Sequence, residues 1–248
     1  MGREVVEAIL GAGDDVTLVG AADPTFAGKT VRDALGLDSS VVIEKDLASS
    51  LAASKADVVV VFTVPASAME NIRTAMKAGT VPVVGTTGIT PENLAEIRAL
   101  SEECGVGEII APNFAIGAVL MMKVAGEVAK YLPAVEIIEL HHDKKLDAPS
   151  GTSIKTAELI AAARKEEYIP TGDCDSGARG AEFGGVRIHS VRLPGFIAHQ
   201  EIIFGGLGQS LTIRHDSYDR KSFMPGVLLA VRKASGLKSV VYGLENIV

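Results

Sequence analysis

Four consecutive valines, Val58–Val61, form the centre of the clearest strand in this 248-residue sequence. A strand without alternating polar residues is typical of a sheet whose two faces are both covered by helices. Segments with the helical spacing of apolar residues lie on either side of it, and other short apolar strands follow. This alternation with short links predicts parallel βαβ units and a doubly wound α/β sheet.

The expected elements of the first half are short. We expect strands at residues 16–22, 57–62, 81–84 and 108–111, and helices at residues 3–10, 47–54, 67–78 and about 90–104. The last of these helices begins with Thr90-Pro91-Glu92, which places proline at the first helical position and an acid in the first turn. One strand therefore follows another through an intervening helix, as a parallel sheet requires.

The start of the sequence is unusual for such a fold. A doubly wound nucleotide-binding domain normally begins with a strand and a glycine-rich turn before its first helix. Here Met1-Gly2-Arg3 leads directly into a helix. We interpret this as the loss of the first strand and first glycines, by truncation or a mis-assigned start; a fold that begins with a helix is the alternative. Asp23, after the next strand, is placed to bind the ribose of a dinucleotide, although Asp-Pro is also a common turn.

The second half of the sequence changes to consecutive strands. We expect helices at residues 117–132, 152–165 and 222–234, strands at 135–142, 186–192, 198–204 and 210–217, and a loop rich in Gly and Asp at 171–180. The last helix and the tail at 240–242 could return to the first domain. Consecutive strands without helices between them predict a mixed or antiparallel sheet and therefore a second, α+β domain. We assign residues 1–112 and about 222–248 to the first domain and residues 113–221 to the second.

Composition narrows the class of protein. The formal net charge of −7 argues against nucleic acid as a partner, because phosphate binding needs a basic face. The two cysteines, Cys104 and Cys174, fit free thiols in a reducing compartment. The longest apolar run is far shorter than a membrane span, and no signal peptide precedes it. We therefore expect a cytoplasmic protein that binds neither nucleic acid nor membranes.

Residues 139–152 contain the densest group of reactive side chains. His141 and His142 close an expected strand and are followed by Lys145, and histidine is suited to proton transfer near neutral pH. Pro149-Ser150-Gly151-Thr152 then begins a helix, whose free N–H groups and dipole favour a carboxylate or phosphate. The alternative is a solvated turn capped by serine. We expect no metal site, because no acid or cysteine lies at ligand spacing.

Two loops after expected strands are further candidate sites. Gly85-Thr86-Thr87-Gly88 lies between a strand and a helix, at the edge where open α/β sheets bind ligands. A tight turn with a helix cap is the alternative reading of this loop. Ala111-Pro112-Asn113-Phe114 follows the last strand of the first domain, and we interpret it as a hinge, a cofactor contact, or both.

The motifs together resemble those of the 4-hydroxy-tetrahydrodipicolinate reductases, also called dihydrodipicolinate reductases, of the diaminopimelate route to lysine. The resemblance covers nearly the whole chain, and residues 139–152 are its most specific part. Shorter contributing motifs are Phe-Thr-Val-Pro (62–65), Gly-Thr-Thr-Gly (85–88), Ala-Pro-Asn-Phe (111–114), Ile-His-Ser-Val-Arg (188–192) and Phe-Gly-Gly-Leu-Gly-Gln (204–209).

The resemblance implies a Rossmann-type cofactor domain, an α+β domain for substrate binding and tetramer formation, and NADPH or NADH as hydride donor. It implies that His141 is the proton donor or acceptor and Lys145 the proton donor. His142 and the backbone of Gly151 and Thr152 would bind the carboxylates of a small dicarboxylate substrate. The implied dinucleotide contacts are Met1, Asp23, Gly85, Thr86, Thr87, Ala111, Pro112, Asn113 and Phe114.

The sequence departs from the family pattern in places. Besides the missing start, Val61 stands where the family usually has Asp, and Gln209 stands where Glu is usual. No arginine directly follows Asp23, which leaves the choice between NADH and NADPH open. Two other functions remain as alternatives: a truncated, non-catalytic dinucleotide-binding or oligomer-forming remnant, and a different dehydrogenase such as an aspartate or semialdehyde enzyme. For a semialdehyde enzyme, Cys104 is a poor nucleophile because it has no partner histidine.

Overall fold

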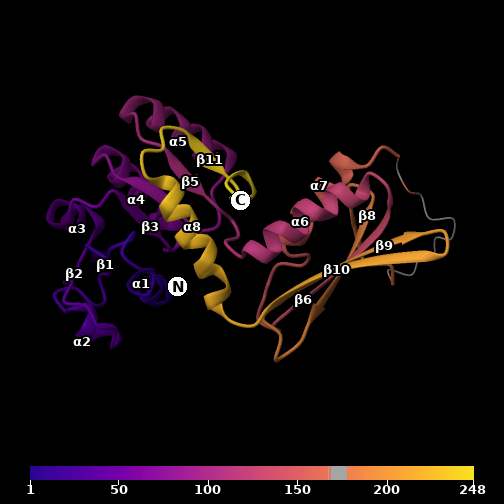
Figure 1. The fold of residues 1–248 in the computed structure, drawn as a ribbon, viewed down its shortest axis with the longest axis horizontal. Coiled ribbons are helices and arrows are strands. Elements are labelled where there is room, and N and C mark those ends of the chain that lie inside the picture. The colour runs from indigo at the N-terminus through magenta and orange to yellow at the C-terminus, as the bar shows by residue number, and fades with distance from the viewer. Residues whose placement is uncertain (167, 169–177) are drawn as a thin grey trace. The chain divides into compact units, whose positions relative to one another are not determined.

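The computed structural model describes residues 1–166, 168 and 178–248. They form two compact units: the first comprises residues 1–114 and 223–248, and the second residues 115–222. Figure 1 shows the elements of each unit. Most of the expected loop at 171–180, including Cys174, lies outside the described residues. Cys104 is a free, partly buried thiol.

The first unit is built on a four-stranded sheet in the order β11-β5-β4-β3. Its strands are β3 (Val58–Val61), β4 (Val81–Val84), β5 (Glu108–Ile110) and β11 (Val240–Tyr242). Every pair in it is parallel, which confirms the predicted parallel sheet. The carboxyl-terminal tail supplies β11, which pairs with β5 through Val241 and Ile109.

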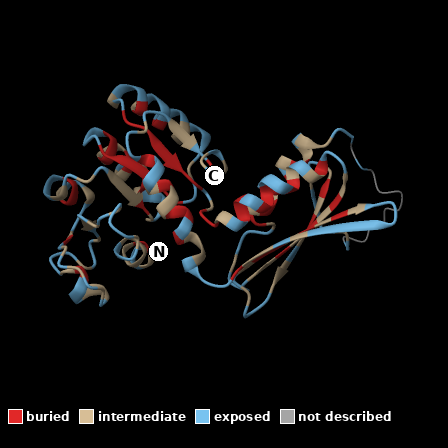
Figure 2. Ribbon diagram, viewed as in Figure 1, coloured by how far each residue is buried: buried red, intermediate tan, exposed pale blue. Residues whose placement is uncertain are grey.

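Helices cover this sheet, as a doubly wound fold requires. They are α1 (Gly2–Leu10), α3 (Leu47–Ser54), α4 (Pro65–Lys77), α5 (Pro91–Cys104) and α8 (Met224–Ala234). All residues of β4 and β5 are buried, so both faces of these central strands are covered (Figure 2). α8 packs against β3, β4 and β5, while α4 and α5 pack against each other.

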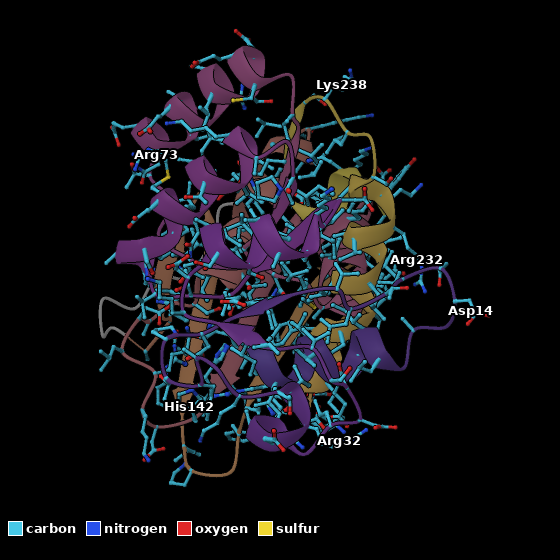
Figure 3. The ribbon with its side chains drawn as sticks, turned by 90° about the vertical axis from the view of Figure 1, so that its left-hand side faces the viewer. Asp14, Arg32, Arg73, His142, Arg232 and Lys238 are labelled. Carbon is cyan, nitrogen blue, oxygen red and sulfur yellow. The ribbon has the colours of Figure 1, made fainter. Side chains whose placement is uncertain are left out.

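Local sequence sets the ends of these helices. Thr90 caps α5 in a capping box with Asn93, Pro91 takes the first helical position, and Gly105 ends the helix in a left-handed conformation. The turn that follows α1 is tied to α8, because Arg232 on α8 donates to the Asp15 carboxylate at 2.6 Å, next to Asp14 (Figure 3). No helix in the described parts of the chain is long and apolar enough to cross a membrane.

The four valines that predicted the sheet are less buried than expected. β3 is an edge strand of the described sheet, and only Val61 in it is buried, while Val58, Val59 and Val60 are half-buried. The expectation that both faces of this strand are fully covered is therefore met only at Val61. The order of the strands places β4 on one side of β3 and no described strand on the other.

The strand expected at 16–22 is mostly absent. Only Ala21–Ala22 form a strand, β1, which pairs in parallel with β2 (Ile43–Glu44) in a separate two-stranded sheet. Residues 16–20 have no ladder partner among the described residues, so their apolar sequence alone does not make them a strand. The short helix α2 (Val31–Leu35) and β2 were not predicted, because both are too short to give a periodic signal.

Glu108 is an exception in the apolar core of the first unit. Its side chain is fully buried on β5, and neither carboxyl oxygen has a hydrogen-bond partner in the described structure. Burial raises the pKa of Glu108 to about 8. The carboxyl group is therefore protonated in the folded protein at neutral pH, because its charged form has lost its hydration without gaining a partner.

This burial predicts a pH-dependent stability. The folded state retains a proton that the unfolded state releases between about pH 4.5 and about pH 8, so the free energy of unfolding falls as the pH rises through this window. Glu108→Gln removes the titrating group and is expected to remove a few kcal/mol of this fall, at about 1.4 kcal/mol per pKa unit. Urea unfolding at several pH values measures it, with Glu103→Gln on the exposed side of α5 as control. The same pH dependence in Glu108→Gln and the parent would contradict the prediction.

The second unit is a five-stranded mixed sheet in the order β10-β9-β6-β8-β7. Its strands are β6 (Ala134–His141), β7 (Ala181–Phe183), β8 (Val186–Arg192), β9 (Ala198–Gly206) and β10 (Gln209–Ser217). β6 pairs antiparallel with β9 but parallel with β8, which confirms a mixed sheet and excludes a purely antiparallel one. The parallel pair arises because the chain crosses from β6 to β8 by way of a helix. β7 was not predicted.

Two helices, α6 (Ile116–Ala129) and α7 (Gly151–Ala163), pack together against one face of this sheet. The core between them includes Ile137, Ile160, Ile188, Ile202 and Phe204, all of which are fully buried (Figure 2). Alternate residues of β6 point into this core, so the inward series Val135, Ile137 and Glu139 includes one carboxylate. That carboxylate is the first component of the candidate site.

Candidate active site

The reactive segment of the sequence joins β6 to α7. His141 is the last residue of β6, His142 follows it, and α7 begins at Gly151. Ser150 caps α7 by accepting a hydrogen bond from the backbone N–H of Ser153 at 3.2 Å. Gly151 and Thr152 thus stand in the first turn of a capped helix, where the helix dipole favours an anion.

Glu139 lies at the centre of the segment. Its buried carboxylate accepts from both terminal nitrogens of Arg192, at 2.8 Å from Nη1 to Oε2 and 2.7 Å from Nη2 to Oε1. The same carboxylate accepts from the backbone N–H of Ser150 at 3.3 Å and is paired with Nδ1 of His141. One side chain thus joins two strands and the start of α7.

The charge state of Glu139 follows from these donors. Burial alone would raise its pKa, but hydrogen bonds from His141, Arg192 and Ser190 outweigh burial and lower the pKa to about 2. The carboxylate is therefore ionised over the whole range in which the protein can be active. A bidentate arginine is the partner that best compensates a buried carboxylate.

The two histidines have different surroundings. His141 is mostly buried, and its Nδ1 faces Oε2 of Glu139. Its other ring nitrogen, Nε2, has no hydrogen-bond partner among the residues described. His142 is exposed, and Figure 3 labels its side chain. His141 is therefore the fixed histidine of the pair and His142 the one open to solvent.

Lys145 is held within its own loop. Its Nζ donates to both oxygens of Asp147, at 2.7 and 2.8 Å, and its side chain is 22% exposed. The hydrogen bond from Lys145 lowers the pKa of Asp147 below its usual value. The backbone oxygen of Asp147 also accepts from Arg192 Nη2 at 2.8 Å, which links the loop to Glu139 through the arginine.

A chain of buried polar side chains extends from the start of α7. The Ser150 and Ser153 hydroxyls lie 2.8 Å apart, Ser153 donates to Gln200 at 2.8 Å, and Gln200 donates to Thr156 at 2.8 Å. Sequence reasoning assigned no role to Glu139, Arg192 or Gln200. Two features of the sequence could have pointed to Glu139 and Arg192. Glu139 is an acid at an inward position of the alternating strand at 135–142, and Arg192 ends the motif at 188–192.

In the first unit, the candidate loops lie together at one edge of the parallel sheet. The loop after β3 contacts the loop after β4, because Thr63 N–H donates to the Thr86 hydroxyl at 3.0 Å. Ala111, after β5, donates to Val84 at the end of β4 at 2.9 Å. Gly85 lies directly on Phe62: a Cβ at Gly85 would come within 2.1 Å of that ring. Glycine is therefore required at this position, because the Phe62 ring fills the space that any side chain would take.

Members of these loops differ in exposure. Thr86, Ala111 and Phe114 are buried, and the Phe114 ring centroid is 5.7 Å from that of Phe62, so these residues also hold the loops in place. Thr87 and Pro112 are exposed, while Gly85 and Asn113 are half-buried. Backbone and small side chains, rather than charged groups, form this edge.

Asp23 and Met1 stand apart from these loops. Asp23 follows β1 in the separate two-stranded sheet, and its Oδ1 accepts from the N–H of Thr25 at 2.8 Å. This bond is that of the Asp-Pro turn weighed from the sequence. Met1 precedes α1 and makes no side-chain cap. The hydrogen bonds described for Asp23 and Met1 connect them to residues other than the loops after β3, β4 and β5.

No group of three or more His, Cys, Asp or Glu side chains within the described ranges is arranged to hold a metal ion. The carboxylates of the β6–α7 segment instead accept hydrogen bonds from arginine, lysine and backbone N–H groups. This arrangement can bind an anion and exchange protons without a resident metal ligand set.

Comparisons with known proteins agree over the whole chain. The family described as "Dihydrodipicolinate reductase, N-terminus" matches residues 1–114, and "Dihydrodipicolinate reductase, C-terminus" matches residues 117–248. The 4-hydroxy-tetrahydrodipicolinate reductase of Desulfitobacterium hafniense (strain DSM 10664 / DCB-2) is 52% identical, covering 99% of this chain and 94% of the relative. That of Listeria innocua is also 52% identical, covering 100% and 95%.

A solved structure gives the same result. The dipicolinate-bound dihydrodipicolinate reductase of Paenisporosarcina sp. TG-14 superposes with a TM-score of 0.85 and 45% sequence identity. The match covers 100% of this chain and 95% of that one. Both units are therefore similar to those of one known protein, and not to pieces of different ones.

Proposed function

The chain belongs to the dihydrodipicolinate reductase family, and on this basis we propose that it reduces 4-hydroxy-tetrahydrodipicolinate to tetrahydrodipicolinate with NADPH or NADH. The family resemblance inferred from the motifs is confirmed. The reaction belongs to the diaminopimelate route to lysine. The observation that supports it most directly is the β6–α7 segment, where the proton-carrying side chains of His141 and Lys145 lie close in sequence to the start of α7.

Substrate binding is assigned to the start of α7. The backbone N–H groups of Gly151 and Thr152 and the exposed side chain of His142 are suited to the carboxylates of a small dicarboxylate. The similar protein from Paenisporosarcina was solved with dipicolinate, itself a dicarboxylate. This binding also explains why an acidic protein gathers histidine and lysine in this loop.

Proton transfer is assigned to His141 and Lys145. The substrate must lose its 4-hydroxyl group as water, and a bound NADPH or NADH would supply the hydride that adds to the resulting unsaturated ring carbon. His141 exchanges a proton through Nε2, since Nδ1 faces Glu139. Lys145 is the proton donor, and it exchanges its contact with Asp147 for one with the substrate.

We assign the dinucleotide to the first unit, at the carboxyl edge of β3, β4 and β5. The residues present fit such a group, because the loops after all three strands meet at this edge and present backbone and small side chains there. Thr87, Pro112 and Asn113 would line it, with Gly85, Thr86, Ala111 and Phe114 fixing the loops. Asp23 would contact the ribose, and Met1, which directly precedes α1, would also contact the dinucleotide. No arginine follows Asp23, so both NADPH and NADH remain candidates.

We further propose that the protein is a cytoplasmic homotetramer that assembles through its second unit. The sheet face opposite α6 and α7 exposes half-buried apolar side chains of β6 and β9: Ile138, Leu140 and Ile203. In the described structure no helix packs on that face. Such a face is typical of a surface that a second copy covers. Light scattering gives the mass that tests it.

Turnover tests the proposed reaction. The purified protein is mixed with freshly formed substrate and either NADPH or NADH, and the nucleotide absorbance is followed. We expect nucleotide oxidation that depends on both substrate and protein. Nucleotide and dipicolinate binding without turnover would instead fit the non-catalytic remnant. The comparisons do not support that alternative, because both family matches and the curated relatives extend over nearly the entire chain.

A further inference from the structure

We propose that Glu139, held by Arg192, is a positioning residue that fixes His141 for proton transfer and keeps the start of α7 in register with it. The inference rests on the proposed function, because it assigns a role to residues that surround the proposed site. It concerns a buried carboxylate that the substrate does not need to touch. All of the contacts that support it lie in the second unit.

The first observation is the geometry within β6. Glu139 and His141 are two residues apart on one strand, so their side chains lie on the same face. Oε2 of Glu139 is paired with Nδ1 of His141. Because an ionised carboxylate can only accept, Nδ1 of the histidine carries the hydrogen in this pair. Nε2 is then the ring nitrogen that exchanges a proton with a ligand.

The second observation is the cross-strand register. Arg192 lies directly opposite His141 in the parallel pair of β6 and β8. Its fork donates to both oxygens of Glu139, at 2.7 and 2.8 Å. This contact leaves the carboxylate little rotational freedom, because both of its oxygens are held in one plane. The histidine ring is consequently paired with a fixed acceptor.

The third observation joins the histidine to the rest of the site. Oε1 of Glu139 accepts from the N–H of Ser150, the residue that caps α7, at 3.3 Å. Arg192 Nη2 donates in addition to the backbone oxygen of Asp147, the residue that holds Lys145. Glu139 and Arg192 therefore connect the proton-exchanging ring, the anion-binding helix start and the lysine loop.

The variant Glu139→Gln separates positioning from simple packing. A glutamine has the same shape, but one of its two terminal atoms is a donor. In one orientation the NH2 group faces His141 Nδ1 and Arg192 Nη1, and in the other it faces Arg192 Nη2 and the Ser150 N–H. Two donors lose their acceptor in either case, so the ring or the helix start is released.

The chain offers a closely matched control. Glu136 lies on the same strand, on the opposite face, and is also paired with one arginine and one histidine: Arg179, and His189 at 2.8 Å. We expect Glu139→Gln to lower kcat by about 10- to 100-fold, as for a misplaced catalytic group, with KM changed by less than about threefold. Glu136→Gln is expected to stay within about twofold of the parent in kcat. The mass of each variant is checked against that of the parent.

A second readout does not depend on turnover. With ¹⁵N-labelled histidine, the His141 ring of the parent is expected to show the Nδ1–H form when neutral, and Glu139→Gln to lose that preference. If the parent shows this form but does not turn over substrate, the proposed function fails while the positioning contact stands. If the parent turns over substrate and Glu139→Gln keeps kcat within about twofold, the positioning role is overturned.

Arg192→Lys provides the test if Glu139→Gln does not fold. Lysine keeps the charge but cannot make the forked contact. We expect a smaller fall in kcat than in Glu139→Gln, together with weaker Nδ1–H preference at His141. Unchanged kcat with an unchanged ring signal in Arg192→Lys would also overturn the role. Equal losses in Glu139→Gln and Glu136→Gln would assign the effect to lost stability and likewise overturn it.

Discussion

In the His141→Gln variant, kcat is expected to fall by about 10²- to 10⁴-fold, the range lost when a general acid–base group is removed. Glutamine retains a polar side chain at the end of β6, but it cannot exchange a proton near neutral pH. The His141 ring is already fixed through Nδ1 by Glu139, so the loss removes a preorganised group and not a loose one. Steady-state kinetics with saturating nucleotide and substrate measures the effect.

KM is informative in the same experiment. If His141 acts mainly in the transition state, kcat and kcat/KM fall together, while KM stays close to that of the parent. His189→Gln is the matched control, because His189 is paired with Glu136 in the same way as His141 is paired with Glu139. It is expected to keep near-parental turnover. A His141→Gln variant with near-parental kcat would remove His141 from the chemistry.

The second large effect is expected in Lys145→Ala. The lysine ammonium is the assigned proton donor, so its removal is expected to lower kcat by about 10²- to 10⁴-fold. Asp147 loses its partner in this variant, and its carboxylate then lies next to a dianionic substrate. We therefore expect KM for the substrate to rise as well, in contrast to His141→Gln. Initial rates over a range of substrate concentrations separate the two effects.

The neighbouring lysine is the control for charge alone. Lys144→Ala removes the same charge from the same loop, but Lys144 is exposed and has no described contact with Asp147. If Lys144→Ala and Lys145→Ala lose similar activity, the loop contributes a general positive field and not a specific donor. The double variant of His141 and Lys145 is expected to lose less than the product of the single losses, because groups that serve one step are not additive.

Sequence reasoning predicted the fold best where the signal for an element is contained in its own residues. The apolar runs at β4 and β5 and the capped helix α5 are found where expected. It was wrong about how deeply Val58–Val61 are buried and about the strand at 16–22. Both features depend on which other strand pairs with the segment. Strand pairing is a property of the tertiary structure, and the spacing of apolar residues along the sequence does not specify it.

The candidate site shows the same division. His141, His142, Lys145 and Gly151 belong to one contiguous segment, so the sequence brings them together without any folding argument. Arg192 does not, and it meets Glu139 only through the parallel register of β6 and β8. The prediction of a mixed or antiparallel sheet did not specify which strands pair or in which register. Glu139 was therefore read only as part of a motif, without its buried pair.

The edge position of Val58–Val61 has a consequence for handling the protein. β3 presents one row of backbone N–H and C=O groups that the described sheet does not pair. An edge strand of four β-branched residues without charge or proline is the kind of segment that recruits another chain by strand addition. When the protein is concentrated or warmed, we therefore expect aggregation to begin by pairing of chains along β3, before the core of the second unit unfolds.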